Sequence, residues 1–522
     1  MESNSEQQHN QEVKENFEDV EESKVIEVEH PANPVSVAEK DSQLENAIYS
    51  QKFYCQDKKS IDEHTLSITQ NFIMVDNQES TNIFLQNIAG ATVSKVSVES
   101  RRKLKVNNLP ADKQLFCLTI HLYSKVIKTS FFGSKKTRRQ HFDLNYYIED
   151  ESVANAWRNL ILQAANNPQF IASNQREPTV NDIPPFKRLL LVFVNPASGK
   201  GLAAARWTKS KPFLEKAGCT FTEVFTEYSG HARDYVQKLE ASELVKYDGL
   251  VTVSGDGLPH EVINGLCLRP DWESVKHIPL GPLPGGSGNA IVKNLLVRAG
   301  EETSLTNACF LIAKGKTTHS DLIVYEMPEK PKVYSFLSLV WAAMAKIDIE
   351  SEKVRWLGAM RFDVYGVLAI LKNKTYRAKL TYSETDNNLP PLEEEIKGDE
   401  WKRIEDTWSY FNVHKMPYIT EDCHAAPVKD FQDGYNHLVA LKGASNTRFK
   451  MTKILLGLTS GFCADEANLK KNKVFYDKMK AFRLETENIP NNYYSIDGEK
   501  YSSPIIQGSI KEKALTMFCT KP

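Results

Sequence analysis

One local pattern occurs three times between residues 189 and 289: an apolar run ends in a turn of small residues, and a helical stretch follows. The turns read NPASGKG at 195–201, SGDG at 254–257 and GGSGN at 285–289. Continuous apolar runs are typical of parallel strands buried on both faces, and open sheets of this kind bind ligands where their strands end. The sequence therefore predicts an α/β unit whose three turns meet at one sheet edge.

Glycine in such turns lets the backbone approach a phosphate closely, and the amides of the following helix face the anion. The turn at 195–201 matches neither a P-loop nor a dinucleotide fingerprint, and each turn alone is a weak signal, but together the three turns indicate a nucleotide site. Asp256 stands between two glycines, where its charge would repel phosphate. This placement suits a proton acceptor or a group near Mg²⁺, although an aspartate that supports its own turn is the alternative. We expect Pro259 at the first helical position and Glu261 in the first turn.

The chain of 522 residues is too long for one ordinary core and divides by composition into five segments. We predict a disordered acidic tail (1–48), a small β-rich module (49–165), a linker containing four prolines (166–186), an α/β ATP-binding domain (187–318) and a β-rich, β-sandwich-like lipid-binding domain (319–522). The acidic stretch at 383–404 is expected to be an exposed loop.

The β-rich module has two clear strand candidates, Phe116–Tyr123 and Phe142–Ile148, and a helix over 153–164 that carries Trp157. Strands closed by one amphipathic helix resemble a pleckstrin-homology-like module. A basic hairpin tip at 131–139 lies between the strands; it could bind anionic lipid or a protein partner, or simply be solvated.

The overall charge is 65 − 67 = −2, so the chain as a whole is not expected to bind nucleic acid. The N-terminus has no apolar signal region, and the longest apolar run, near Phe336–Ala345, is too short to span a bilayer. Eight scattered cysteines favour a reducing compartment. We therefore expect a cytoplasmic protein that meets lipid only from the water side.

The sequence SGDGLPHEV at 254–262, followed by NGL at 264–266, resembles the signature of sphingosine kinases, in the diacylglycerol-kinase-like superfamily. Further blocks resemble the family in the same order: 195–201, TEYSGHA at 226–232, 285–290, IDIESEK at 347–353 and DGE at 497–499. The resemblance covers roughly residues 186–510. Two positions depart from it: Pro259 replaces an unbranched or apolar residue, and Lys346 stands where relatives often carry a second acid.

The resemblance implies a role for each matching residue. Asp256 would be the catalytic base, with Ser254, Gly255 and Gly257 shaping the substrate site and Asp348 pairing with the lipid's ammonium or hydroxyl. The nucleotide site would contain Asn195, Pro196, Ala197, Thr226, Glu227, Tyr228, Ser229, Gly230, Glu261, Gly286, Ser287, Gly288, Arg355, Arg361, Asp497, Gly498 and Glu499. The two arginines would hold phosphates, and Mg²⁺ would lie near Asp256 and Asp497, with its ligands left open by the sequence.

The resemblance implies ATP-dependent phosphorylation of the primary hydroxyl of sphingosine or a related sphingoid base, on a plasma or endosomal membrane surface. Ceramide or diacylglycerol kinase activity and a non-catalytic lipid-binding scaffold are the alternatives. Apolar residues around 336–344, 364–371 and 454–458 are candidates for the lipid tail or for ordinary core packing. The sequence leaves a homodimer open.

Overall fold

The structure is a computed structural model that describes residues 27–28, 49–56, 61–69, 71–76, 81–103, 113–129, 135–167, 170, 183–351, 353–354, 360–445, 447–487 and 492–520. Arg355, the hairpin tip at 131–134, and most of the expected tail and linker lie outside the described residues. Within the described part of the chain, no helix is both long and apolar enough to span a membrane.

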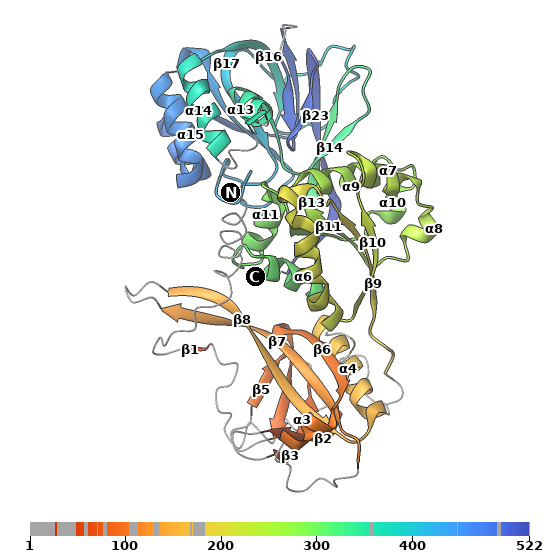
Figure 1. Cartoon of the computed structure of the whole chain (residues 1–522). Helices are drawn as coiled ribbons and strands as arrows, with labels where there is room; N and C mark the ends of the chain where they lie inside the picture. Colours follow the sequence, from red (N-terminus) through yellow and green to blue (C-terminus); the bar gives the residue numbers. More distant parts are fainter. Residues whose placement is uncertain are drawn as a thin grey trace, which may run out of the picture.

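The N-terminal part is an antiparallel sheet in the order β1-β7-β8-β2-β3-β4-β5, with β6 paired to β7 (Figure 1). Helix α4 packs on it and buries Trp157 edge-on against Phe53, with ring centroids 5.5 Å apart. The Asp150 carboxylate starts this helix by accepting the N–H groups of Ser152 and Val153, so the expected helix and both expected strands are confirmed. The elements are β1 (Glu27–Val28), β2 (Tyr49–Gln56), β3 (Ile61–Ile68), β4 (Phe72–Asp76), β5 (Thr81–Phe84), η1 (Leu85–Asn87), β6 (Ile88–Lys95), α3 (Val98–Lys103), β7 (Phe116–Thr129), β8 (Lys135–Ile148) and α4 (Glu151–Asn166).

The middle of the chain forms the expected parallel sheet, in the order β10-β9-β11-β12, with helices packed around it. Strands β9 and β11 are the apolar runs of the sequence, and their central residues are fully buried. The elements are β9 (Arg188–Val194), η3 (Ser198–Gly201), α6 (Leu202–Lys216), β10 (Cys219–Phe225), α7 (His231–Lys238), α8 (Ala241–Leu244), β11 (Gly249–Ser254), α9 (Gly257–Cys267), α10 (Trp272–Val275), β12 (Leu280–Pro284), α11 (Ala290–Arg298) and α12 (Leu305–Lys314).

The C-terminal part is antiparallel, with helices α13, α14 and α15 grouped on one side of its strands (Figure 1). Its elements are β13 (Thr317–Glu326), β14 (Val333–Ser335), β15 (Ser338–Ala342), α13 (Ala343–Ser351), α14 (Met360–Lys372), β16 (Tyr376–Ser383), β17 (Lys402–His414), β18 (Asn436–Lys442), η5 (Gly443–Ser445), α15 (Arg448–Ser460), η6 (Phe462–Ala464), α16 (Glu466–Lys471), β19 (Phe475–Met479), β20 (Ala481–Thr486), β21 (Tyr494–Ile496), β22 (Glu499–Tyr501) and β23 (Ile505–Phe518).

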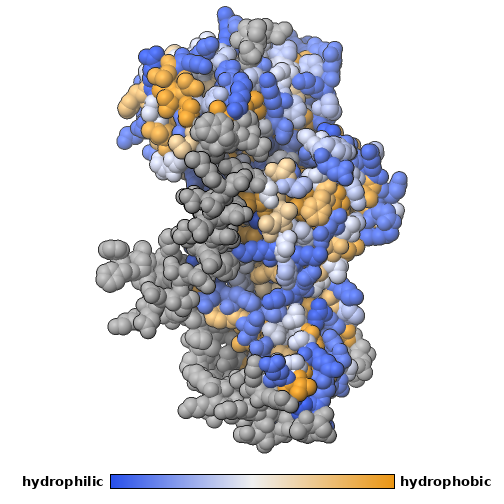
Figure 2. All heavy atoms as spheres, in the orientation of Figure 1, coloured by the Kyte–Doolittle hydropathy of each residue, from blue (hydrophilic) through white to orange (hydrophobic). Residues whose placement is uncertain are grey.

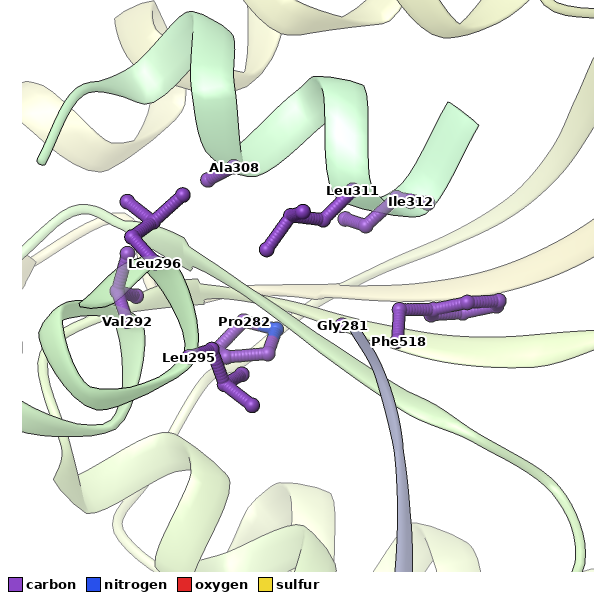
Figure 3. Close-up of a pocket in the computed structure, with 9 residues that line it drawn as sticks. All are labelled: Gly281, Pro282, Val292, Leu295, Leu296, Ala308, Leu311, Ile312 and Phe518. Atoms are coloured by element: carbon purple, nitrogen blue, oxygen red, sulfur yellow. The ribbon is translucent and has the colours of Figure 1, made fainter. Parts of the chain in front are cut away.

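The last strand, β23, joins the two halves into one sheet. Met517 pairs in parallel with Leu280 of β12, while the rest of β23 pairs antiparallel with β13 and β20. Phe518 then packs among residues of β12, α11 and α12, around a small apolar cavity of about 10 Å³ (Figure 3). That volume is at the lower limit for one water molecule, and the lining is apolar, so the C-terminus completes the core of the α/β part.

The apolar run near Phe336–Ala345 forms β15 up to Ala342, and α13 begins at Ala343. Two expectations about the start of α9 differ from the structure. Helix α9 begins at Gly257, two residues earlier than Pro259 indicated, so the proline is its third residue and Glu261 its fifth. A proline fits there because the first N–H groups of a helix have no intrahelical partner.

The N-terminal sheet is docked against the α/β part through α6 and α12. Lys314, at the end of α12, is 2% exposed, and its Nζ donates to the carbonyl oxygens of Leu85, Ile88 and Ala165 at 3.0, 3.2 and 2.7 Å. A Cβ at Gly90 would lie 2.4 Å from the carbonyl oxygen of Lys216, so the backbones of β6 and α6 meet directly. These contacts join residues of the N-terminal part (85–165) to residues of the α/β part (216–314).

Candidate active site

The three turns meet at one edge of the parallel sheet. Val253 of β11 pairs with Val194 of β9, and Ser254 pairs with Pro284 of β12, so all three strands end together. The Gly285 N–H donates to the Ser254 carbonyl at 2.8 Å. The juxtaposition expected from the sequence is therefore present for turns 195–201, 254–257 and 285–289.

Glycine is required where these turns touch. A Cβ on Gly286 would lie 2.4 Å from Gly255 Cα, and a Cβ on Gly255 would lie 2.7 Å from the Gly288 carbonyl oxygen. Gly199 has φ +60°, and a Cβ there would lie 2.3 Å from the Gly285 carbonyl oxygen. Because a Cβ at any of these three glycines would collide with a neighbouring backbone, glycine allows the turns to approach one another closely at the edge of the sheet.

Two polar side chains inside the turns fix their conformation, and sequence reasoning assigned neither of them a role. The Ser198 hydroxyl accepts from Ser254 Oγ at 3.1 Å and from the Gly255 N–H at 3.3 Å. Asn289 Oδ1 accepts the N–H groups of Gly285 and Gly286 at 3.2 and 3.1 Å. Both residues lie in turns that the sequence had already indicated. The sequence therefore predicted the location of the site but not the roles of these two residues.

Asp256 lies where α9 and α11 begin. Its Oδ2 accepts the N–H of Ala290 at 2.8 Å and its Oδ1 accepts that of Ile291 at 3.0 Å, so the carboxylate bonds the first turn of α11. Burial raises the pKa of Asp256 to about 6, helped by the negative charges of Asp497 and Glu421, while the two N–H donors act in the opposite direction. A carboxyl group that ionises close to neutral pH can accept a proton from an alcohol.

Helix α9 carries further polar groups at one-turn intervals after Asp256. His260 Nδ1 lies 3.0 Å from Asp497 Oδ2. Asn264 bonds both backbone groups of Tyr334, accepting its N–H and donating to its carbonyl oxygen at 2.9 Å each. The helix that begins at Asp256 is thereby fastened to the C-terminal part of the protein.

Asp497 is fully surrounded by donors. It has a left-handed φ of 51°, and its side chain is inaccessible to solvent. Besides His260, its oxygens accept from four groups of one segment: Ser335 Oγ at 2.6 Å and the N–H groups of Phe336, Leu337 and Ser338 at 3.2, 3.1 and 3.0 Å. This arrangement favours an anchoring role for Asp497. Glu499, two residues later, is exposed, and a Cβ on Gly257 would lie 3.8 Å from its Oε1.

The expected nucleotide residues 226–230 follow β10 at the same sheet edge, because Phe225 pairs with Val194. The Thr226 N–H donates to the Val194 carbonyl at 2.9 Å. Glu261 reaches this segment from α9 and accepts the N–H groups of Gly230 and Ala232 at 2.8 and 3.2 Å. Glu261 therefore holds the start of α7, and the adjacent Tyr228 ring stacks on His231 with centroids 4.8 Å apart.

Asp348, the expected partner of the lipid head group, lies on α13 and is half-buried. Its Oδ2 accepts from Ser495 Oγ at 2.5 Å, and Ser495 precedes Asp497 by two residues on the same hairpin. Lys346, which departs from the family pattern, lies with its Nζ 3.7 Å from Glu350 Oε1. Glu350 also accepts a hydrogen bond from Tyr493 Oη at 3.0 Å. Asp348 and the helix of Asp256 are thus linked through β21.

Arg361 is buried at the start of α14, with its guanidinium 4.5 Å from the centre of the Phe362 ring. Its expected companion, Arg355, lies outside the described residues. Only half of the predicted arginine pair is therefore described.

Glu421 is a site residue that the sequence did not indicate. It lies between β17 and β18, and its Oε1 accepts from Asn289 Nδ2 at 2.9 Å. Its segment is held by Asn294 of α11, which bonds the backbone N–H and carbonyl of Tyr418 at 3.1 and 2.8 Å. Since 132 residues separate Glu421 from Asn289, no local pattern could have found this contact.

The chain is similar in sequence to known kinases. A family model described as diacylglycerol kinase catalytic domain matches residues 189–325. Sphingosine kinase 1 of Mus musculus is 32% identical over 355 residues, which cover 63% of this chain and 91% of that protein. Sphingosine kinase 1 of Arabidopsis thaliana is 32% identical over 320 residues, and the match spans 57% of this chain and 64% of that protein.

Among solved structures, a diacylglycerol kinase from Bacillus anthracis str. Sterne matches with a TM-score of 0.45 and 19% identity, covering 65% of this chain and 98% of that one. The family assignment depends on the sequence relatives, of which the mouse protein is covered almost throughout. With its glycine-lined turns gathered around Asp256, the chain belongs to the sphingosine kinase family.

Proposed function

We propose that this protein transfers the γ-phosphate of ATP to the primary hydroxyl of sphingosine or a related sphingoid base, giving sphingosine 1-phosphate and ADP. The observation that carries the proposal is the position of Asp256, a carboxylate with a raised pKa beside three turns that approach one another closely at glycines. Phosphoryl transfer depends on positioning and charge stabilisation more than on covalent chemistry. The turns position the nucleotide, and Asp256 removes the proton of the substrate hydroxyl.

The nucleotide phosphates would lie at the sheet edge formed by turns 195–201, 254–257 and 285–289, with residues 226–230 at the end of the same edge. Mg²⁺, when bound, would neutralise charge on those phosphates. The exposed carboxylate of Glu499 beside Gly257 fits a contact with this ion, direct or through water. Asp497 fits a positioning role, because its oxygens already accept from five donors.

The substrate's ammonium would pair with Asp348. Neighbouring residues of α13, Met344 and Ile347, are buried in one apolar cluster with Ile454 and Leu458 of α15. The sphingoid chain would enter between these helices, so that the charged head stays at Asp348 and the hydroxyl reaches Asp256. Arg361, and Arg355 beyond the described residues, would contact phosphate.

A membrane surface is the expected source of this substrate. Figure 2 shows apolar residues gathered over α14 and α15, and their spacing on α14 forms one helix face. The exposed apolar residues are Met360, Val364, Val367, Leu368, Leu371, Phe449 and Leu456. The same two helices carry Lys372, Arg448, Lys450 and Lys453, which would favour an anionic cytoplasmic leaflet of the plasma or endosomal membrane.

The domain scheme follows from the same proposal: 187–318 binds ATP and 319–522 binds lipid, the two sharing one sheet through β23. The N-terminal strands β2–β8 closed by α4 support a pleckstrin-homology-like module over 49–165.

The test is a substrate panel with radiolabelled ATP: sphingosine, ceramide and diacylglycerol in matched micelles. We expect sphingosine to be phosphorylated, and Asp256→Asn to lower its turnover by about 10²–10⁴-fold. Asp399→Asn, at an exposed position of the acidic loop, is the matched control and should have wild-type activity. Preferred labelling of ceramide or diacylglycerol would overturn the substrate, and full turnover by Asp256→Asn would overturn the base.

A further inference from the structure

We infer that His121, His141 and Asp143 form a binding site for a divalent transition-metal ion, such as Zn²⁺, on the N-terminal sheet. The three residues lie on adjacent strands β7 and β8, where His121 pairs directly with Asp143. His141 and Asp143 are two residues apart and therefore share one face of the sheet. Their candidate ligand atoms all lie within 4.8 Å of one another.

Both imidazoles point to the same oxygen. His121 Nδ1 lies 2.5 Å and His141 Nε2 lies 2.9 Å from Asp143 Oδ1, and the two rings are stacked with centroids 5.8 Å apart. Each ring nitrogen that approaches this carboxylate oxygen so closely requires either its own hydrogen or a metal ion between the two atoms. Imidazole and carboxylate are ligands that Zn²⁺ accepts at about 2.0–2.2 Å. Seating the ion would need the nitrogen–oxygen distances to open to roughly 3.4 Å, the ligand spacing of a tetrahedron with such bonds.

The buried histidine is already oriented for ligation. The His121 ring is 5% exposed, and its other nitrogen, Nε2, lies 2.9 Å from Thr92 Oγ1 on β6. A hydrogen bond from Nε2–H to this hydroxyl would leave the Nδ1 lone pair facing the cluster, as outer partners do for metal-bound histidines. Burial lowers the pKa of His121, and contact with His121 lowers the pKa of Asp143, so neutral imidazole and ionised carboxylate are both favoured.

The positive charge of Lys216 opposes binding of a cation at this cluster. Lys216, the last residue of α6, is close enough to lower the pKa values of His121 and Asp143. This lysine belongs to the α/β part, and α6 contacts β6 at the junction of the two parts (Figure 1). The proposed ion would therefore bind the adjacent strands β7 and β8 together near the border of the module with the kinase fold, and Lys216 would limit its affinity.

The test is a titration of the chelator-treated full chain with Co²⁺, followed by its visible absorption, and then displacement by Zn²⁺. We expect one saturable equivalent in the wild type, loss of that equivalent in His141→Ala and Asp143→Asn, and a proton released on binding. His141 and Asp143 are more than 40% exposed, so these variants should fold, which a melting curve checks.

Three further variants distinguish the proposed site from non-specific binding of the metal to histidines. Thr92→Val, which keeps the side-chain shape, should weaken binding about 10- to 100-fold. Lys216→Gln should tighten it. His277→Ala, at an exposed position outside the cluster, should leave it unchanged. Absence of a saturable equivalent, or an equivalent that survives in His141→Ala, would overturn the proposal and identify a cluster held by protons alone.

Discussion

His260 Nδ1 lies 3.0 Å from Asp497 Oδ2, so helix α9, which follows Asp256, is bonded one turn later to the hairpin that carries Glu499. The same hairpin bonds Asp348 through Ser495. The proposed base, the expected lipid-binding acid and the expected magnesium-side acid are therefore connected by two hydrogen bonds, His260–Asp497 and Ser495–Asp348, and by the hairpin between them. A change at Asp497 should disturb all of them.

Substitution of Asp497 should mainly lower stability, whereas substitution of Glu499 should mainly affect catalysis. Asp497→Asn places an amide against three backbone N–H groups and should lower the free energy of unfolding by about 3 kcal/mol, the cost of breaking a buried charged contact. Glu499→Gln is a surface change and should stay within about 0.5 kcal/mol while raising the magnesium requirement. Urea unfolding and initial rates at varied Mg²⁺ measure the two effects. Equal destabilisation by both variants would contradict this division.

Ionisation of Asp256 should set the acidic limb of the pH–rate profile. Its pKa of about 6 means that the carboxylate is protonated, and cannot accept the substrate proton, below that pH. We expect kcat/KM for sphingosine to rise tenfold per pH unit below about 6 and to level above it. Rates measured from pH 5 to 8 at saturating ATP check this, and a limb near pH 4 would contradict it.

Glu421→Gln should move that limb to lower pH. The negative charge of Glu421 contributes to the raised pKa of Asp256, so its removal makes the carboxylate easier to ionise. Gln keeps an oxygen that can accept from Asn289 Nδ2 and so preserves the turn. The measurement is the same pH profile, with Asp422→Gln as the neighbouring exposed control. An unchanged limb in Glu421→Gln would show that this charge does not act on Asp256.

Asp348→Asn should weaken use of sphingosine more than binding of ATP. Asn retains an oxygen for Ser495 but loses the charge that would pair with the substrate's ammonium. We expect kcat/KM for sphingosine to fall by roughly tenfold or more, as for loss of a charged hydrogen bond of about 1.5–3 kcal/mol. Nucleotide affinity, measured by fluorescence titration, should change little. Losses of similar size in both quantities would count against the assignment.

Lys314 should make stability depend on pH above neutrality. Burial lowers the pKa of Lys314 to about 7 from 10.5, so between these values the unfolded chain holds a proton that the folded chain does not. Stability should therefore rise with pH across this window and be lost again as the pH falls to about 7. Lys314→Met removes the titrating group and should flatten this part of the curve. Urea unfolding of both proteins from pH 7 to 10 measures the difference, and identical slopes would be the contrary result.

The sequence by itself determined the parallel strands, their glycine turns and the position of Asp256, because each depends on a few consecutive residues. Continuous apolar runs form buried strands, and the glycines at 255 and 286 fit only where two backbones touch. It also indicated the strands β7 and β8 and the helix α4 through their periodicity. Its local error was also confined to a few residues, because Pro259 indicated a later start for α9 than the structure has.

Only the tertiary structure decided which distant residues complete the site. Glu421 reaches Asn289 across 132 residues, Asp497 reaches His260 across 237, and β23 returns from the C-terminus to close the α/β core. The cluster of His121, His141 and Asp143 likewise depends on the register of β7 against β8. Such contacts depend on sheet pairing and on the need to satisfy buried polar groups. Both act between residues that are far apart in the sequence, so no local sequence pattern predicts them.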